Sequence, residues 1–375
     1  MKILFLIRSL DYGGAERQLV VLSKGLKKNG HTVSVAVFFH GGKLEEELLT
    51  AGIPVHSLEK KGRWDIVQFM FRLKRLVFQE KPDILHSYLP TANILTVIFK
   101  PCNPKTSVIW GVRASFMDLD QYDRLTRFSY WMEARLANYA DGIIANSNAG
   151  KDLATTKGFP QNKIFVIPNG IDTDIFYPNK SVGENCRLEW GIKEDYKVVG
   201  LVGRIDPMKD YPTFFKAAQI INQQRNDVSF VCVGDGLAEY KQSILRLCKE
   251  MQIEHSIIWA GIRSDMCNVY NAFDVYVNSS YGEGFANTIA EAMACGIPCV
   301  VTNVGDSSII VGDTGMVVRP RSPAELAQGI LSLLETSRYK EKDIRRHIIT
   351  NFSIERLVKT TIHLMENIFS LNTIR

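Results

Sequence analysis

The sequence has no apolar segment long enough to cross a membrane. Its apolar N-terminal run, Ile3–Ile7, is five residues long and has a charged residue on each side, Lys2 and Arg8. A membrane-spanning helix needs about 20 apolar residues, and so short a run does not make the core of an export signal. We therefore expect Ile3–Ile7 to be the buried first strand of a cytoplasmic protein.

The sequence also lacks the cysteine and glycine motifs that are typical of several protein classes. The chain has seven cysteines, an odd number, and no Cys-x-x-Cys pair, which argues against a disulfide framework and favours free thiols in a reducing cytoplasm. Cys295 and Cys299 stand in an apolar stretch with no histidine nearby to complete a metal site. Gly13-Gly14 lacks the Gly-x-Gly-x-x-Gly spacing of a dinucleotide fingerprint, which argues against an NAD-dependent enzyme.

Acidic residues are scarce in the first half of the chain. Residues 1–170 carry 23 Lys and Arg against 15 Asp and Glu, a net charge of +8, so the remaining residues carry −3 of the total of +5. A basic half suits nucleic acid, anionic lipid or a phosphorylated substrate. A nucleic-acid-binding module would interleave aromatic and basic residues in a recognisable motif. The sequence shows no such motif, so we expect no nucleic acid partner.

Short apolar runs alternate with stretches of helical periodicity along the whole chain. Five runs in the first half are expected to be buried strands: Ile3–Ile7, Thr32–Phe38, Ile84–His86, Val108–Trp110 and Gly142–Ala145. The pattern restarts in the second half with five more: Val198–Val202, Val228–Val233, Ile257–Trp259, Val275–Val277 and Cys299–Val301. Apolar strands separated by helices indicate parallel sheets covered on both faces. We therefore predict an α/β protein with two Rossmann-like, doubly wound domains.

Proline and glycine residues mark the boundary between these domains, in Ile167–Asp172 and at Pro178. We predict a first domain over residues 1–170, a linker over 171–190 and a second domain over 191–351. A C-terminal helix over 352–375 is a candidate to cross back to the first domain. Ligands of doubly wound sheets bind beyond the carboxyl ends of the strands, so the loops that follow the strands are the candidate site.

The loop after Val198–Val202 carries two cations five residues apart, Arg204 and Lys209. An arginine can bind two phosphate oxygens at once and a lysine adds a point charge, so the pair suits a diphosphate. In the first domain, Gly13-Gly14 opens the first helix, where backbone N–H groups can bind an anion. Taken alone, each feature also fits an ordinary surface loop.

The segment from Gly282 to Glu291 is the sharpest feature of the sequence. Glu283 lies in the loop after Val275–Val277, and Glu291 follows after seven intervening residues, on the next helix. A carboxylate there can accept hydrogen bonds from a ribose diol, as in dinucleotide-binding folds. Because Glu291 stands in an apolar run, we expect it to have a polar partner. The alternative is two unrelated surface glutamates.

The residues between the two glutamates suit a phosphate group. Gly284 allows a tight turn, and Asn287 or Thr288 is expected to cap the helix. The N–H groups near Phe285 and Ala286 then offer a phosphate site at the helix N-terminus.

Together these motifs resemble a known family. Glu283 and Glu291 form the Glu-x7-Glu motif of retaining GT-B glycosyltransferases of family 4 (glycosyl transferases group 1), within the similar segment EGFANTIAEAMACGIPCV. Further matches are Gly13-Gly14, the pair Arg204 and Lys209, Val233-Gly234-Asp235-Gly236 and PNGIDTDIF. The matches run in order across nearly the whole chain, which also resembles bacterial surface-polysaccharide transferases of the O-antigen type.

The resemblance implies that the first domain binds the acceptor and faces the second, which binds a nucleotide sugar, across a cleft. Arg204 and Lys209 would hold the donor diphosphate. Glu283 would contact the transferred sugar, Glu291 the ribose, and the main chain of Ile262-Arg263 the base. The donor-binding residues expected on this basis are Gly13, Gly14, Gly203, Arg204, Lys209, Gly234, Ile262, Arg263, Glu283, Gly284, Phe285, Ala286, Asn287 and Glu291.

The resemblance further implies retention of configuration without an enzymic nucleophile, because the leaving phosphate helps to deprotonate the acceptor. It implies no metal and no cofactor, with a UDP-sugar as the expected co-substrate. Asp172-Thr173-Asp174 has the form of the metal-binding motif of another glycosyltransferase fold, but its place in the linker indicates a structural role. Asp118-Leu119-Asp120 is expected to start a helix.

One position departs from the family pattern. Many members carry a histidine after the strand that corresponds to Val108–Trp110, where it touches the donor sugar, but this chain has Gly111-Val112-Arg113-Ala114. Arg113 is expected to take over part of that role. His86, at the end of its strand, is a second candidate, with a structural histidine as the alternative. The expected catalytic residues are Glu283, Arg204, Lys209, Arg113 and His86.

Two expected helices of the first domain combine aromatic and basic residues, as do helices in a membrane interface. They contain Arg63, Trp64, Phe69, Phe71, Arg72, Lys74, Arg75 and Phe78, and Arg124, Arg127, Phe128, Tyr130, Trp131 and Arg135. The alternative is that the rings pack on the sheet. The family is rich in enzymes that extend polyprenyl-diphosphate-linked glycans. We therefore expect a peripheral enzyme on the anionic inner face of the cell membrane that adds a hexose or N-acetylhexosamine to such an acceptor.

Other functions compete with this hypothesis. A GT-B transferase of a soluble small-molecule acceptor would share every donor motif. A nucleotide-sugar epimerase is a rival within the fold, whereas a phosphorylase needs a longer chain for its cofactor-binding elaborations. A non-catalytic glycan-binding relative would be expected to have lost Arg204, Lys209 or Glu283, and all three are present.

Overall fold

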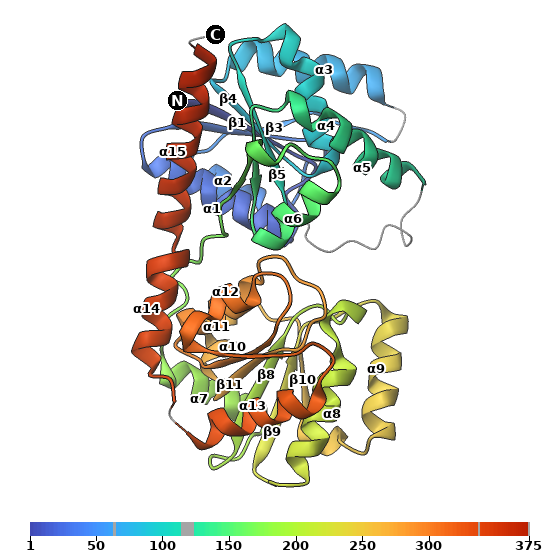
Figure 1. Cartoon of the computed structure of the whole chain (residues 1–375), viewed down its shortest axis with the longest axis vertical. Helices are drawn as coiled ribbons and strands as arrows, with labels where there is room; N and C mark the ends of the chain where they lie inside the picture. Colours follow the sequence, from blue (N-terminus) through green and yellow to red (C-terminus); the bar gives the residue numbers. More distant parts are fainter. Residues whose placement is uncertain (63–64, 114–123, 337, 374–375) are drawn as a thin grey trace. The chain divides into compact units, whose positions relative to one another are not determined.

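The computed structural model describes residues 1–62, 65–113, 124–336 and 338–373, which form two compact units (Figure 1). The first unit is Met1–Gly170 together with the chain from Ile354 onward, and the second is Ile171–Ser353. The residues for which we expected a linker, 171–190, belong to the second unit, where Lys180–Glu189 forms helix α7. The boundary therefore lies at Gly170, directly before that segment.

The first unit contains a seven-stranded, wholly parallel sheet in the order β3-β2-β1-β4-β5-β6-β7. Its strands are β1 (Lys2–Ile7), β2 (Thr32–Val37), β3 (Val55–Ser57), β4 (Ile84–Tyr88), β5 (Ser107–Val112), β6 (Gly142–Ala145) and β7 (Ile164–Val166). Its helices are α1 (Gly14–Lys28), α2 (Glu45–Thr50), α3 (Ile66–Glu80), α4 (Pro90–Phe99), α5 (Arg124–Leu136), α6 (Asn148–Thr156) and α15 (Ile354–Thr373). Chain order reverses at β1, the switch point where such folds bind ligands.

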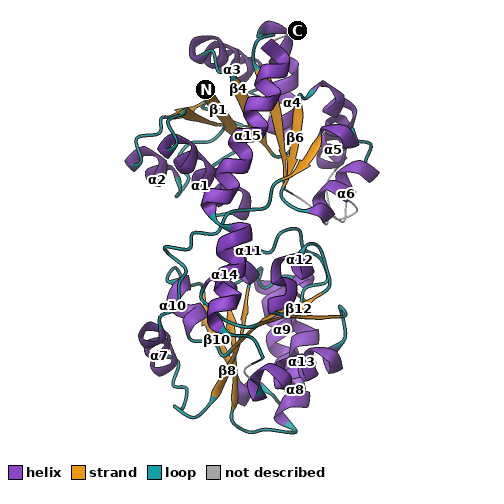
Figure 2. Cartoon of the chain, turned by 60° about the vertical axis from the view of Figure 1, so that its left-hand side comes forward, coloured by secondary structure: helices purple, strands orange, loops and turns teal. Residues whose placement is uncertain are grey.

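Both faces of this sheet are covered by helices (Figure 2). Phe5 of β1 packs in a cluster with residues of α1, α2 and α15, whereas its neighbours Leu4 and Leu6 face a cluster with α3 and α4. The second face continues over α5 and α6, whose apolar residues pack with Val108 and Trp110 of β5. Alternate residues of one strand thus serve opposite faces, which explains why the strands are apolar throughout.

The chain end, drawn in red in Figure 1, is helix α15 of the first unit. Val358 and Met365 of α15 are buried with α1 and β1. Gly25 of α1 permits this contact, because a Cβ there would lie 2.3 Å from Val358 Cγ2.

The second unit contains a six-stranded parallel sheet in the order β10-β9-β8-β11-β12-β13. Its strands are β8 (Lys197–Val202), β9 (Val228–Val233), β10 (Ile257–Gly261), β11 (Val275–Asn278), β12 (Cys299–Thr302) and β13 (Met316–Val318). Besides α7, its helices are α8 (Tyr211–Asn222), α9 (Ala238–Glu250), α10 (Met266–Asn271), α11 (Asn287–Ala294), α12 (Ser307–Val311), α13 (Pro323–Glu335) and α14 (Glu341–Phe352). Chain order reverses at β8, between β9 and β11.

The predicted fold class is confirmed: each unit is a Rossmann-like domain with a parallel sheet between helices. Three strands were not predicted, β3, β7 and β13, each of three residues. Among the described residues, no helix is both long and apolar enough to span a membrane.

Candidate functional site

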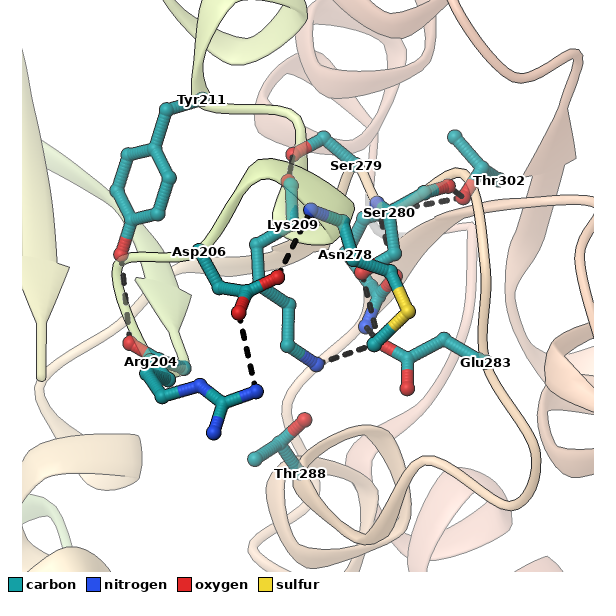
Figure 3. Close-up of polar contacts among 12 residues, drawn as sticks. Arg204, Asp206, Lys209, Tyr211, Asn278, Ser279, Ser280, Glu283, Thr288 and Thr302 are labelled. Atoms are coloured by element: carbon teal, nitrogen blue, oxygen red, sulfur yellow. Dashed lines mark hydrogen bonds and ion pairs between the residues drawn. The ribbon is translucent and has the colours of Figure 1, made fainter. Parts of the chain in front are cut away.

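Lys209 and Glu283 meet beyond the carboxyl ends of β8 and β11 (Figure 3). Lys209 Nζ lies 2.5 Å from Glu283 Oε1, and the two side chains are 17% and 9% exposed. The residues come from loops that follow neighbouring strands at the switch point, so the fold brings together two charges that are 74 positions apart in the chain.

Two polar residues at and just after the end of β11 help to fix the Glu283 carboxylate. Ser280 Oγ donates to Glu283 Oε1 at 2.7 Å, and Asn278 Nδ2 donates to the same oxygen at 3.4 Å. Thr302 Oγ1 in turn donates to the Ser280 carbonyl at 2.5 Å. Asn278 and Ser280 were missed in the sequence analysis. The available signal was their position shortly after the apolar run Val275–Val277.

The backbone around Lys209 is tied to the Glu283 loop. Ser279 Oγ donates to the Lys209 carbonyl at 2.8 Å, and the Tyr281 N–H donates to the Met208 carbonyl at 3.0 Å. Asp206 Oδ1 accepts from the Met208 N–H at 3.0 Å and so closes the turn before Lys209. The ion pair therefore rests on loops that are linked by their own hydrogen bonds.

Arg204 is much more accessible than Lys209. Its guanidinium points to Asp206 (Figure 3), with Nη2 3.0 Å from Asp206 Oδ2. The Arg204 side chain is 70% exposed. An exposed ion pair of this kind contributes little to stability, about 0–1 kcal/mol. Arg204 can therefore exchange Asp206 for another anion at small cost.

Glu291 has the polar partner that its apolar surroundings require. The hydroxyl of Tyr270, a fully buried residue of α10, donates to Glu291 Oε2 at 2.7 Å. The expected side-chain cap of α11 is wrong. Ala286, and not Asn287 or Thr288, is the N-cap residue, and its side chain makes no capping hydrogen bond; Thr288 Oγ1 instead accepts from the Tyr276 hydroxyl at 2.8 Å.

The glycines near this site allow close backbone approach. A Cβ on Gly234, which has φ 132°, would lie 2.1 Å from the Gly203 carbonyl oxygen. The N–H of Gly234 also donates to the Gly261 carbonyl at 2.8 Å. Gly284 accepts from the Asp306 N–H at 3.0 Å, which holds the loop before the buried residues Phe285 and Ala286.

The two residues expected near the base differ in environment. Ile262 is 78% exposed. The guanidinium of Arg263 pairs with Asp265 at 2.8 Å and also with Glu189 of α7. Its side chain therefore has a structural role, and the contact of its main chain with the base stays a prediction.

In the first unit, the candidate His86 is fully buried. Its Nδ1 lies 3.0 Å from the Ile109 carbonyl oxygen, and Nε2 has no hydrogen-bond partner among the described residues. Burial lowers the pKa of His86 to about 3, so the ring is neutral. The ring packs against Phe5 and Tyr88. This environment favours the structural interpretation of His86.

Arg113, at the end of β5, lies over Tyr88. Its guanidinium carbon is 4.4 Å from the ring centroid, and Nη2 donates to the Tyr88 hydroxyl at 2.6 Å. Nη1 donates to Asn169 Oδ1 at 3.1 Å. Tyr88 and Asn169 were missed as site residues in the sequence analysis, although Tyr88 closely follows the predicted strand Ile84–His86 and Asn169 lies in the predicted domain boundary Ile167–Asp172.

The side-chain carboxylate of Glu16 lies close to the N-terminus of its own helix, α1. Gly13 is the N-cap residue and Gly14 starts the helix. A Cβ on Gly13 would lie 2.1 Å from Glu16 Oε2, so the Glu16 carboxyl folds back over the place where we expected a phosphate. Burial raises the pKa of Glu16.

Sequence comparisons match glycosyltransferases over both units. Residues 12–175 match the family "Glycosyltransferase Family 4", and residues 196–336 match "Glycosyl transferases group 1". A UDP-Gal:alpha-D-GlcNAc-diphosphoundecaprenol alpha-1,3-galactosyltransferase of Escherichia coli is 26% identical over 298 residues, which cover 77% of this chain and 76% of the relative. A D-inositol 3-phosphate glycosyltransferase of Mycolicibacterium smegmatis is 29% identical over 208 residues, 54% of this chain and 47% of the relative.

Among solved structures, Anabaena HepE in complex with UDP superimposes with a TM-score of 0.85 at 21% identity, covering 98% of this chain and all of HepE. This likeness shows the GT-B fold. The chain is built from the two domains of group 1 and family 4 glycosyltransferases.

Within these glycosyltransferase domains, the structure brings together Arg204, Lys209 and Glu283 at one end of the second sheet, with Gly203 and Gly234 beside them. The Asp-x-Asp sequence at Asp172 forms a turn in which Asp172 Oδ1 accepts from the N–H groups of Asp174 and Ile175, both at 3.1 Å. Asp118-Leu119-Asp120 lies outside the described residues. The described part of the chain holds no group of three His, Cys, Asp or Glu side chains suited to a metal ion.

Proposed function

We propose that the protein is a retaining glycosyltransferase that moves a hexose or N-acetylhexosamine from a UDP-sugar to a lipid-linked glycan. The observation that carries this proposal is the partly buried Lys209–Glu283 ion pair beside the exposed Arg204. Two cations at the switch point of a parallel sheet match the needs of a nucleotide diphosphate. HepE, which shares the fold, is known in complexes with UDP and UDP-glucose, and this supports uridine as the base.

The transfer breaks the bond between the anomeric carbon and the diphosphate, which keeps the electron pair. A new bond forms from the acceptor oxygen to the anomeric carbon on the same face of the sugar, and the acceptor proton goes to the leaving phosphate. Arg204 and Lys209 stabilise the growing charge on the diphosphate. Lysine has three N–H donors. Lys209 donates one of them to Glu283 Oε1, so that Lys209 can bind Glu283 and the diphosphate together. Glu283 then orients the sugar hydroxyls.

We propose that no metal or other cofactor takes part, because the two cations can neutralise the leaving diphosphate. Calorimetry with UDP, GDP and ADP tests the donor, and transfer of radiolabelled sugar in excess EDTA tests the metal. We expect UDP to bind most tightly and EDTA to leave transfer unchanged. An inverted anomer in the product, or activity that EDTA abolishes and Mn²⁺ restores, would contradict the mechanism.

The acceptor proposal rests on an exposed surface of the first unit. On α3, Val67, Phe71 and Phe78 are 83%, 68% and 65% exposed, at intervals that place them on one side of the helix. Lys74 and Arg75 are also exposed on α3. The side chains that pack inward from α3 include Phe69 and others of its cluster, so the exposed aromatics form a second, outward set.

Helix α5 carries a similar surface on the same face of the sheet. Phe128 and Trp131 are 50% and 52% exposed, stack on each other at 5.7 Å, and Trp131 lies under Arg135 at 5.4 Å. Exposed aromatics flanked by cations suit the interface of an anionic membrane. The expected Arg63 and Trp64 lie outside the described residues. The diphosphoundecaprenol in the name of the Escherichia coli relative supports a lipid-linked acceptor and a peripheral location on the cytoplasmic leaflet.

Sedimentation with anionic vesicles tests this surface. We expect the protein to bind at low salt and to be released at high salt, because screening weakens surface attraction. The double variant Phe71→Ser, Trp131→Ser should lower the bound fraction several-fold, whereas Leu237→Ser, at an even more exposed apolar residue of the second unit, should not. Equal vesicle binding by all three proteins would contradict the proposal. Absence of vesicle binding with full transfer to a soluble acceptor would favour the second candidate, a small-molecule acceptor as in the inositol-phosphate relatives.

A further inference from the structure

Glu291 stands on α11 among residues that offer it little polarity. Its neighbours Ala290 and Ala292 are fully buried, while Glu291 itself is half-buried. A carboxylate in this setting needs hydrogen bonds to remain ionised. One comes from a different helix, α10, where the Tyr270 hydroxyl donates to Glu291 Oε2 at 2.7 Å.

The Tyr270 ring is rigidly held. It is 0% exposed and packs edge-on against Phe176, Phe273 and Tyr276, with ring centroids 5.9, 6.3 and 6.0 Å away. Burial, followed by the charge of Glu291, raises the pKa of Tyr270 well above its usual value, so the hydroxyl keeps its proton and remains a donor. Because the ring is fixed and the hydroxyl is protonated, Tyr270 donates its hydrogen bond to Glu291 Oε2 from a fixed position.

We propose that Tyr270 is a positioning residue that holds the Glu291 carboxylate in the orientation that accepts the ribose hydroxyls of the donor. The inference rests on the proposed function, which gives Glu291 its contact with ribose. A carboxylate held by a rigid donor loses less rotational freedom when the ribose binds, so more of the binding energy is retained.

The two glutamates of the motif are thus fixed in different ways. Glu283 is held by Ser280 and Asn278 of its own strand and loop and by Lys209. Glu291 is held from α10, by a residue 21 positions earlier in the chain. Tyr270 therefore adds to the donor site a residue outside every motif that the sequence analysis used.

The test compares UDP with 2′,3′-dideoxy-UDP by calorimetry. The wild-type protein should prefer UDP, and Tyr270→Phe should weaken UDP binding about tenfold while leaving the dideoxy nucleotide nearly unchanged, since one hydrogen bond to a charged group is lost. A purely structural defect would weaken both nucleotides equally. Tyr339→Phe is the matched control, because its hydroxyl donates to the Gly315 carbonyl at 3.0 Å in the same unit. It should leave both affinities unchanged.

Glu291→Gln and Glu291→Asp separate this inference from the proposed function. If Glu291→Gln leaves the preference for UDP intact, the ribose role of Glu291 is wrong. If it removes the preference but Tyr270→Phe does not, the positioning role is overturned. In the Glu291→Gln background, Tyr270→Phe should add less than about a twofold change, because the two residues act as one unit. Glu291→Asp keeps the charge but shortens the side chain and so draws the carboxylate back. It should show the same loss of UDP affinity as Tyr270→Phe, and it tests the inference even if Tyr270→Phe folds poorly. A wild-type preference for UDP in Glu291→Asp overturns the inference.

Discussion

The two units use the same topology but treat polar groups in opposite ways. Beyond β8 and β11 of the second unit, Arg204, Lys209 and Glu283 are charged and pair with one another or with Asp206. At the ends of β4 and β5 of the first unit, His86 and Tyr88 are fully buried, and the cation Arg113 donates to two neutral groups, Tyr88 and Asn169.

In the second unit, the charged side chains can change ion-pair partners, whereas in the first unit the polar side chains are fixed by burial. Paired ions on loops can trade partners when an anion of higher charge arrives, as the diphosphate of a nucleotide sugar would. A guanidinium that lies over Tyr88 and bonds to Asn169 is held by packing and has less reason to move. Loss of a single charge should therefore change UDP binding by the second unit. In the first unit, a change in the protonation of buried groups should change the stability.

The largest expected effect is that of Lys209→Ala on donor binding. Removing a charge-assisted contact costs about 1.5–3 kcal/mol, so UDP affinity should fall by about one to two orders of magnitude. The variant also leaves Glu283, whose side chain is 9% exposed, without its cation. Calorimetry with UDP measures the loss, and Lys216→Ala, at an exposed lysine of α8, is the control that should change nothing. Unchanged UDP binding in Lys209→Ala would break the comparison at its strongest point.

The fold was predictable because its signals are local. Apolar runs of four to six residues define β1, β8 and β9, and Gly-rich loops follow them. Three-residue strands such as β3 and β13 carry too short a pattern to detect. The three strands that were not predicted, β3, β7 and β13, are all edge strands, which have a neighbouring strand on one side only.

Partners were less predictable than motifs. The sequence analysis required a polar partner for Glu291 but did not name Tyr270, because the bond joins two helices whose contact depends on the whole sheet. The predicted cap of α11 failed for a related reason: Thr288 has a tertiary partner, the Tyr276 hydroxyl, that outweighs the local preference. The folding of Glu16 over Gly13 likewise depends on side-chain placement.

The next effect concerns the buried groups of the first unit and sharpens the contrast. Burial raises the pKa of Glu133 to about 7, partly offset by the hydrogen bond from Asn93, and lowers that of His86 to about 3. Below pH 6.5 the unfolded chain binds a proton at His86 that the folded chain does not, so this histidine makes stability fall on acidification. Between pH 4.5 and 7 the folded chain keeps a proton on Glu133 that the unfolded chain loses, so this glutamate makes stability rise on acidification.

Between about pH 4.5 and 6.5 these two contributions oppose each other, each with a slope of about 1.4 kcal/mol per pH unit. Urea unfolding at pH 4.5, 5.5 and 6.5 should therefore show a steeper loss on acidification for Glu133→Gln than for the wild type, and a shallower loss for His86→Asn. Gln preserves an acceptor for Asn93, which donates to Glu133 Oε1 at 2.6 Å. Parallel pH profiles for all three proteins would mean that these groups titrate normally and that burial does not define the first unit.

The smallest expected effect is a gain of affinity in Asp206→Asn. Asp206 has two roles that this change separates: Oδ1 accepts from the Met208 N–H and closes the turn, while Oδ2 pairs with Arg204 at 3.0 Å. Asparagine keeps the first acceptor and removes the charge that competes with the donor diphosphate. Because an exposed ion pair is worth about 0–1 kcal/mol, UDP should bind up to about fivefold more tightly.

The control is Asp343→Asn, which breaks the Arg346–Asp343 pair on α14, where the arginine is also 70% exposed. Calorimetry at low salt resolves a change of this size, and the gain should shrink as salt screens the Arg204 charge. Weaker UDP binding in Asp206→Asn would mean that Asp206 orients Arg204 for the phosphate instead of competing with it, and the charges of the second unit would then be as fixed as those of the first.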